Sequence, residues 1–227
     1  AHAARLNGRL AREIVPHLPL GAESRGALDH DDNVREDQSP ERLGKLKPYF
    51  EKPDGLVTVG NACGITDGAC ALIITTAARA AELELSTLAR FRSWAWAGLD
   101  PARMGLGPVH AAAEALQRAD ANLQDMGVVE LNEAFAAQVL ACQAAFDSDA
   151  FAREQLGRSQ ALGAIDPARL NPNGGAIALG HPVGATGARL LLTTAHELHA
   201  GDHELGLATL CIGGGQGGAV VLERTAA

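Results

Sequence analysis

Apolar residues in this chain gather in short runs, and from residue 69 onward these runs alternate with stretches of helical periodicity. A short apolar run between turn-forming residues predicts a buried strand, whereas apolar positions three or four residues apart predict a helix. The strands expected on this basis are residues 69–76, 88–97, 127–131, 205–211 and 218–223. The helices expected are residues 77–83, 108–120, 133–146 and 184–200. Their alternation predicts an α/β fold with a mainly parallel sheet covered by helices.

Two connections refine this picture. The last two expected strands are separated only by the glycine-rich run at 213–218, and so short a link predicts an antiparallel hairpin. Residues 147–168 have the pattern of a polar helical insertion and are expected to lie outside the core.

The first 68 residues follow a different pattern. Residues 3–14 predict a helix that ends before Pro16. Ser39-Pro40 is a suitable cap and first turn, and it predicts a short helix near 40–46. The remainder of 15–68 is rich in Pro, Gly, Asp and Glu, and so long an irregular stretch indicates either function or disorder.

Composition and charge narrow the class of protein. Hydrophobic residues make up 47% of the chain but aromatic residues only 4%, which predicts a core of small aliphatic side chains. A net charge of −8 argues against a nucleic-acid or anionic-membrane surface, because those surfaces need clustered Lys and Arg. No apolar run approaches the ~20 residues of a membrane span, and the first residues lack the apolar segment of a signal peptide.

Four cysteines, Cys63, Cys70, Cys142 and Cys211, show neither a paired metal spacing nor the density of a disulfide framework. This usage favours a reducing environment, and we expect a cytoplasmic protein, with an organelle matrix as the alternative that the composition leaves open. Cys70 and Cys142 are interpreted as packing residues.

Three histidines, His196, His199 and His203, invite a metal interpretation that we do not favour. Gly201-Asp202 breaks the expected helix before His203, and no nearby acid completes a ligand set. A solvated helix end explains them better, so no metal site is expected.

Three short strings carry the side chains best suited to chemistry: Asn132-Glu133-Ala134-Phe135, Gly180-His181-Pro182 and Cys211-Ile212-Gly213-Gly214-Gly215. A histidine needs only a small pKa shift to work near neutral pH, and a thiol becomes a strong base or nucleophile once a neighbour lowers its pKa. Glycine lets backbone N–H groups approach a carbonyl oxygen that becomes anionic. Together these groups predict acid–base chemistry on a thioester.

Each of these side chains also has a purely structural interpretation. Asn132 could cap the helix expected to begin there, with Glu133 complementing the helix dipole. His181 could be an ordinary core or surface histidine, and Cys211 an inert core thiol at the end of a strand. Taken one at a time, the residues leave both interpretations open.

The same strings resemble a known family. Asn132–Phe135, Asn171–Pro182 and Leu210–Gly217 resemble the three carboxy-terminal signatures of the thiolases, in the acetyl-CoA acetyltransferase and 3-ketoacyl-CoA thiolase branch. Asp32–Arg35 together with Gly60–Gly68 resembles the coenzyme A-binding loop region of that family. Asp100–Gly107 resembles another of its loops, so five strings occur in the family's order.

The resemblance implies a fold, and it also implies that one half of this fold has no counterpart in the chain. Thiolases contain two βαβαβαββ halves, with a loop domain inserted in the first. Residues 67–227 correspond to the second half, for which we expect a five-stranded mixed sheet, and residues 1–66 to part of the loop domain with the CoA-binding loop region. The first half, with the nucleophilic cysteine that becomes acylated, has no counterpart among these residues, so the isolated chain is expected to be inactive.

The resemblance also implies roles for four catalytic residues. His181 would activate the nucleophilic thiol and help donate to the thioester oxygen. Asn132 would orient a water that shares this oxyanion hole. Cys211 would be the acid–base cysteine that takes a proton from acetyl-CoA or returns one, and the N–H of Gly213 would help to form a second oxyanion hole.

Four further residues correspond to positions that bind the substrate. Cys63 stands where the family usually has a serine that touches the pantetheine arm, and a thiol forms a weaker hydrogen bond there. Ala134 and Phe135 correspond to the lining of the acyl pocket. Arg35 corresponds to an arginine near the CoA adenine, although an ordinary solvated charge explains it equally well.

The function implied is reversible acyl transfer between CoA thioesters in fatty acid metabolism, either thiolysis of a 3-ketoacyl-CoA or Claisen condensation of two acyl-CoA molecules. Acyl-CoA and CoA are the expected partners, with no separate cofactor, and the full-length protein is expected to be a homo-oligomer. The alternative is a catalytically silent half from a truncated or split gene that binds CoA or assists assembly. Other condensing enzymes of this fold generally lack the Asn-Glu-Ala-Phe string and the cysteine before three glycines.

One expectation concerns partnership. Residues 185–199 are apolar on most of their circumference in the first turns, as in a helix covered on two sides. Without a first half this face would be exposed as a large apolar patch. The chain is therefore expected to self-associate, to aggregate or to require an amino-terminal half in trans.

Overall fold

A four-stranded sheet of order β1-β4-β3-β2 forms the centre of the computed structural model, which describes residues 1–18 and 26–225. Strands β2 and β3 are parallel, and β4 is antiparallel to both β3 and β1, so the sheet is mixed and the mainly parallel sheet predicted from the alternation is wrong. The strands are β1 (Ala89–Gly98), β2 (Met126–Leu131), β3 (Leu205–Ile212) and β4 (Gln216–Arg224). The α-helices are α1 (His2–Leu6), α2 (Pro40–Leu43), α3 (Ala77–Glu82), α4 (Gly107–Ala119), α5 (Ala136–Phe146), α6 (Asp149–Gln155), α7 (Ala176–Leu179) and α8 (Val183–Ala200). Short 3₁₀ turns span Leu10–Arg12, Pro101–Leu106 and Leu123–Asp125.

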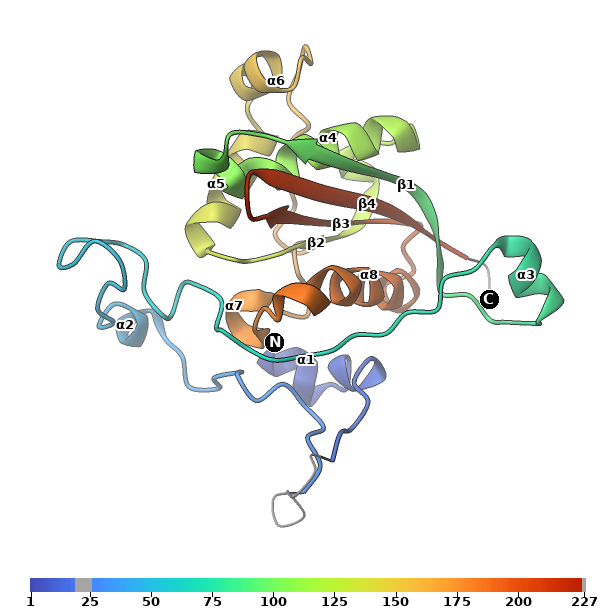
Figure 1. Cartoon of the computed structure of the whole chain (residues 1–227), viewed down its shortest axis with the longest axis horizontal. Coiled ribbons are helices and arrows are strands. Elements are labelled where there is room, and N and C mark those ends of the chain that lie inside the picture. The colour runs from blue at the N-terminus through green and yellow to red at the C-terminus, as the bar shows by residue number, and fades with distance from the viewer. Residues whose placement is uncertain (19–25, 226–227) are drawn as a thin grey trace.

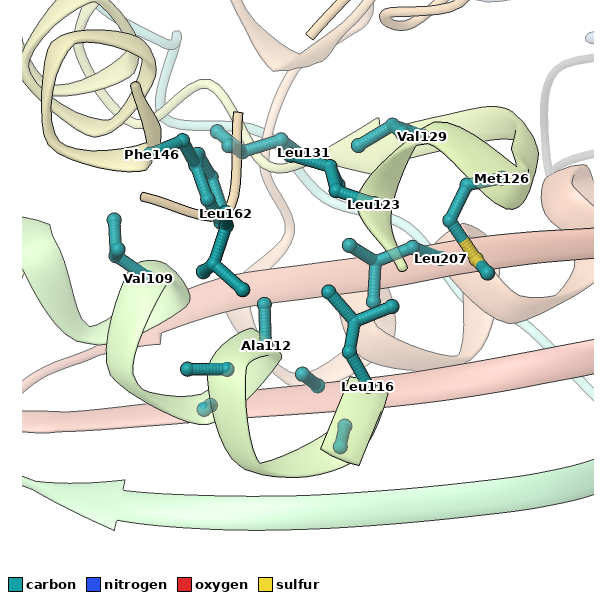
Figure 2. Close-up of a cluster of buried hydrophobic side chains, with 14 of the residues drawn as sticks. Val109, Ala112, Leu116, Leu123, Met126, Val129, Leu131, Phe146, Leu162 and Leu207 are labelled. Atoms are coloured by element: carbon teal, nitrogen blue, oxygen red, sulfur yellow. The ribbon is translucent and has the colours of Figure 1, made fainter. Parts of the chain in front are cut away.

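Helices α4 and α8 cover opposite faces of this sheet (Figure 1). Alternate residues of a strand point to opposite faces, and in β4 Val221 belongs to the core on the α4 side whereas Leu222 packs with Ala195 and Leu198 of α8. Figure 2 shows the core on the α4 side, where Leu116 lies beside Leu207 and Phe146 lies beside Leu162. Aliphatic side chains dominate it, as the composition predicts.

The hairpin and four of the five expected strands are confirmed, but the fifth is wrong. Residues 69–76 are extended without forming a strand, and Ile73 and Ile74 are 93% and 68% exposed. The edge of the sheet beside β2 is instead extended by Leu170, which forms a parallel bridge with Val129. The order βαβαβαββ is therefore present, with its third strand reduced to a single bridge. The apolar run at 69–76 has strand-like composition but no pairing partner in the described part of the chain.

The amino-terminal helix is shorter than predicted. It ends at Leu6 because Asn7 is followed by Gly8 in a left-handed conformation (φ +77°), and only a 3₁₀ turn continues beyond it. The short helix at 40 begins as predicted: Ser39 Oγ accepts a hydrogen bond from the Arg42 N–H, and Pro40 is the first residue. This helix ends at Leu43 rather than near residue 46.

Helix α5 begins at Ala136, three residues later than predicted, and Phe135 occupies its cap position. The interpretation of Asn132 as a helix cap is therefore wrong. The chain stays extended after β2 because the Asn132 N–H donates to the Thr209 carbonyl of β3.

The insertion at 147–168 is only partly what the sequence predicts. It contains one helix, α6, whose Ser148 cap accepts a hydrogen bond from the Phe151 N–H. Leu162 and Ile165 are buried in the main core, so the segment is not outside it. Phe151 and Leu156 pack against the same core, but the large apolar residues of this segment are too widely spaced to show a single period.

Helix α8 is covered on its second side by the amino-terminal segment, which lies beneath it in Figure 1. Arg9 bonds to Glu197 (3.1 Å), and the Thr193 hydroxyl donates to Glu13 (2.6 Å). The expectation that this helix exposes a large apolar face is therefore wrong. On α8 the first residue, Val183, is 79% exposed, whereas Ile65, Ile73 and Ile74 are exposed together on the extended segment.

In the parts of the chain that the structure describes, none of the helices has the length and apolarity needed to span a bilayer.

Candidate active site

Asn132 and His181 meet at the carboxyl end of β2. Asn132 is fully buried, and its amide Nδ2 lies 3.3 Å from His181 Nε2, so the two residues are joined across 49 positions of sequence. Within the described residues, Asn132 Oδ1 is buried and has no hydrogen-bond partner. A buried, unsatisfied amide oxygen is costly, and an ordered water is the usual partner of such a group.

A tight loop positions the histidine. Gly180 has a φ of +100°, which side chains rarely tolerate, and a methyl group at this position would collide with Thr66. On the other side of the ring, His181 Nδ1 lies 2.7 Å from the hydroxyl of Thr186. Burial and the nearby charge of Arg189 lower the pKa of His181. The imidazole is therefore neutral at pH 7 and can accept a proton.

Cys211 is nearly buried in β3, opposite Gly217 of β4. Burial raises the pKa of its thiol, and a charge on Cys63 would raise it further. The resting group is thus a protonated thiol. Just beyond it, Gly213 is exposed and no atom occupies the space that a side chain would take, so its backbone is open to a ligand.

The loop around Cys63 lies against the Asn-Glu-Ala-Phe string. Ala62 and Phe135 form an antiparallel bridge, and the Cys63 N–H donates to the Ala134 carbonyl (3.0 Å). Burial raises the pKa of the Cys63 thiol as well. The structure thus brings Cys63, Ala134 and Phe135 to the end of the sheet that carries Asn132 and Cys211.

Among the residues that the structure describes, Arg35 makes no contact that places it beside Asn132, His181 or Cys211. It is exposed, and in the described residues it forms neither a hydrogen bond nor an ion pair. Its neighbour Asn33 donates to the Ala178 carbonyl of α7 (3.2 Å), which places this loop beside the histidine loop. The role of Arg35 stays a prediction.

Two loop anchors were not found from the sequence. Asn171 has a φ of +44°, and its side chain bonds both the N–H and the carbonyl of Leu131 (2.8 Å each). Glu133, interpreted from the sequence as a dipole complement, instead accepts from the Asn171 amide (2.8 Å) and the Ile177 N–H (3.3 Å). These contacts fix the histidine loop to the end of β2.

A buried ion pair lies beneath the site. Glu130 of β2 is fully buried and accepts a hydrogen bond from Arg189 of α8 (2.9 Å). Burial raises the pKa of Glu130 to about 8, although Arg189 opposes the rise. The available sequence signal was a charged residue inside an apolar strand.

Two surface hollows lie elsewhere. One is lined by residues that include Arg5, Leu10 and His30, and another by Leu123 and Ile165, and neither includes a predicted site residue. Among the described residues, no three His, Cys, Asp or Glu side chains gather as metal ligands would.

Comparison with known proteins places these features in a family. Residues 85–224 match the family model "Thiolase, C-terminal domain", and residues 1–78 match "Thiolase, N-terminal domain". The division predicted between residues 66 and 67 stays a prediction.

Individual relatives agree with these matches. The chain is 48% identical to the acetyl-CoA acetyltransferase of Pseudomonas aeruginosa, over 99% of this chain and 53% of that protein. It is 44% identical to the 3-ketoacyl-CoA thiolase of Vibrio vulnificus, over 99% of this chain and 54% of that protein. The chain thus spans about half the length of these curated relatives.

Solved structures give the same result. The crystal structure of human mitochondrial 3-ketoacyl-CoA thiolase matches with a TM-score of 0.88 and 38% identity, over 99% of this chain and 52% of that one. A second structure of that human protein, in complex with CoA, matches with a TM-score of 0.86 and 39% identity, over 99% and 51%. The chain belongs to the thiolase family.

Proposed function

We propose that this chain carries the acid–base part of an acyl-CoA C-acyltransferase, which cleaves a 3-ketoacyl-CoA with CoA or condenses two acyl-CoA molecules. The contact between Asn132 and His181, at the end of the sheet where β3 carries Cys211, is the observation on which the proposal rests. Relatives named acetyl-CoA acetyltransferase and 3-ketoacyl-CoA thiolase support it, as does a relative solved with CoA. The substrate is then a CoA thioester, with no separate cofactor.

The protonation states suit the proposed roles. In thiolysis Cys211 gives its proton to the α-carbon that leaves as acetyl-CoA, and in condensation its thiolate removes that proton. A pKa raised by burial keeps the thiol protonated, which suits the direction of thiolysis, whereas condensation requires the bound substrate to stabilise the thiolate. Neutral His181 can take the proton of a nucleophilic thiol, and the open N–H of Gly213 can donate to an oxygen that becomes anionic.

The substrate contacts are proposed from position. Cys63, Ala134 and Phe135 line the approach to Cys211, and Arg35 lies on the loop beside α7 where the adenine end of CoA would pass. We further propose a cytoplasmic role in fatty acid β-oxidation, carried out by a homo-oligomer of the full-length protein.

The acyl carrier is proposed to lie outside these 227 residues. A covalent carrier needs an activated thiol with a lowered pKa. Burial raises the pKa of all four thiols, at Cys63, Cys70, Cys142 and Cys211. None of them is therefore suited to attack a thioester at neutral pH.

The isolated chain is accordingly expected to show no thiolysis of acetoacetyl-CoA and no stable acyl-enzyme. Intact-protein mass spectrometry after incubation with acetyl-CoA tests the second point, and a CoA-dependent spectrophotometric assay tests the first. Stoichiometric acetylation at Cys63 or Cys211, together with turnover, would show that the acyl carrier is present in this chain.

A second candidate is a catalytically silent half that binds CoA or pairs with an amino-terminal half in trans. The exposed extended segment at 69–76 favours it, because an unpaired apolar stretch is a template for another strand. Calorimetry would measure CoA binding by the chain. Binding of CoA without turnover, even when the chain is mixed with an amino-terminal half that carries the nucleophilic thiol, would support this candidate over the first.

The same segment predicts that the purified chain associates. We expect light scattering to show dimers or larger species at micromolar concentration, and the variant with Ile73→Lys and Ile74→Asp to be monomeric. Leu140→Lys is a matched control, because Leu140 is also exposed but lies on α5. A monodisperse wild-type monomer would mean that the segment needs no partner.

A further inference from the structure

Thr186 lies behind the proposed catalytic histidine and has no role in the function proposed above. It belongs to the first turn of α8 and is 1% exposed. Its Oγ1 has two neighbours: His181 Nδ1 at 2.7 Å and the Pro182 carbonyl at 3.1 Å. On the far side of the ring, His181 Nε2 faces the Asn132 amide nitrogen at 3.3 Å.

The single hydroxyl hydrogen decides the arrangement. A carbonyl oxygen can only accept, so the Thr186 hydroxyl donates to Pro182, four residues earlier, as threonine in a helix commonly does. Its oxygen must then accept from His181, which requires a hydrogen on Nδ1. Nε2 of a neutral ring is left bare, and this matches the Asn132 N–H group that points at it.

We propose that Thr186 is a positioning residue that holds neutral His181 in the tautomer with its hydrogen on Nδ1. The proton is then accepted at Nε2, the nitrogen beside Asn132, and Nδ1 is closed off by a buried hydroxyl. The inference rests on the role proposed for His181, although the tautomer can be measured whether or not that role holds.

The competing arrangement is specific. If the hydroxyl donated to Nδ1, the hydrogen would sit on Nε2, and the Asn132 amide would have to turn its oxygen toward the ring. The Pro182 carbonyl also accepts hydrogen bonds from the backbone N–H groups of Ala185 and Thr186. It would therefore keep two partners in this arrangement. A direct measurement of the tautomer distinguishes the two arrangements.

Nitrogen-15 NMR of the histidine rings in the full chain provides that measurement. His181 signals are assigned by their loss in His181→Gln, and the spectra are recorded above the pKa of the ring. We expect wild type and Thr186→Ser to show Nδ1–H, and Thr186→Val, which keeps the shape but removes the acceptor, to gain the Nε2–H form. Thr194→Val is the matched control: it removes a buried α8 hydroxyl that has no partner in the described residues.

The outcomes are distinct. An Nε2–H tautomer in the wild type overturns the inference, as does a Thr186→Val protein that keeps Nδ1–H unchanged. If Thr186→Val fails to fold, the wild type and Thr186→Ser still decide the question. Because no turnover is needed, failure here leaves the proposed acyltransferase function standing. Conversely, the expected tautomer together with a chimera that lacks thiolase activity, made by placing these 227 residues in the Pseudomonas aeruginosa acetyl-CoA acetyltransferase, would count against the function and not against the role of Thr186.

Discussion

Cys211→Ser is expected to lower the rate of thiolysis about 100- to 10,000-fold, the range for removing a general acid–base group. The test requires a chimera in which these 227 residues replace the matching segment of the Pseudomonas aeruginosa acetyl-CoA acetyltransferase. The two sequences are 48% identical over this segment, and the acyl carrier that we propose to lie outside these 227 residues is expected in the rest of that protein. A serine hydroxyl fills the same space but does not exchange protons near neutral pH as a thiol can.

The step at which the reaction of the Cys211→Ser variant stops identifies the role of Cys211. Because Cys211 is proposed to act on the α-carbon rather than on the acyl carrier, the variant should still form an acyl-enzyme with acetyl-CoA, visible by mass spectrometry. Cys70→Ser is the matched control, since this thiol is only half-buried and is assigned no role; it should keep wild-type kinetics. A Cys211→Ser chimera as fast as its parent would remove Cys211 from the mechanism.

Strands whose partners lie in this chain were predictable from their pattern. β1, β3 and β4 are short apolar runs, and the hairpin between β3 and β4 follows from the glycines between them. The run at 69–76 has the same composition and is exposed instead. The pattern of apolar residues shows which side chains a segment can bury. Whether the segment joins a sheet depends on a neighbouring strand, which the pattern does not identify.

The site was predictable only as separate strings. Nothing in the spacing of Asn132 and His181 places them 3.3 Å apart, and the family resemblance suggested that they act together. Thr186, Asn171 and Arg189 were missed because their roles depend on contacts made only in the fold: an adjacent ring nitrogen, a strand end forty residues earlier and a buried carboxylate. Asn132 was open to misinterpretation as a cap because asparagine favours that position as well.

At pH 5, where the folded chain holds Glu130 protonated, Glu130→Ala is expected to lower the free energy of unfolding by about 3 kcal/mol, within the range for truncating a buried side chain to alanine. The loss has two sources: the space left by a fully buried side chain, and an Arg189 without its closest partner. Arg189 is still influenced by Glu13 and Asp31, which limits the cost. Urea unfolding at constant m-value measures the difference.

Glu130→Gln is the matched control, and it makes the prediction depend on pH. Burial raises the pKa of Glu130 from 4.5 to about 8, so between these values the folded chain holds a proton that the unfolded chain has released. Wild-type stability therefore falls as the pH rises through this window, while the glutamine contributes no such slope. Burial raises the pKa of Glu13 and Asp31 too, so the wild type and the glutamine variant both lose some stability as the pH rises. The difference in stability between the two proteins therefore reports on Glu130 alone. We expect the free energy of unfolding of the glutamine variant, relative to that of the wild type, to increase from pH 5 to pH 8. Parallel curves would mean that Glu130 is ionised throughout and that the pair with Arg189 outweighs burial.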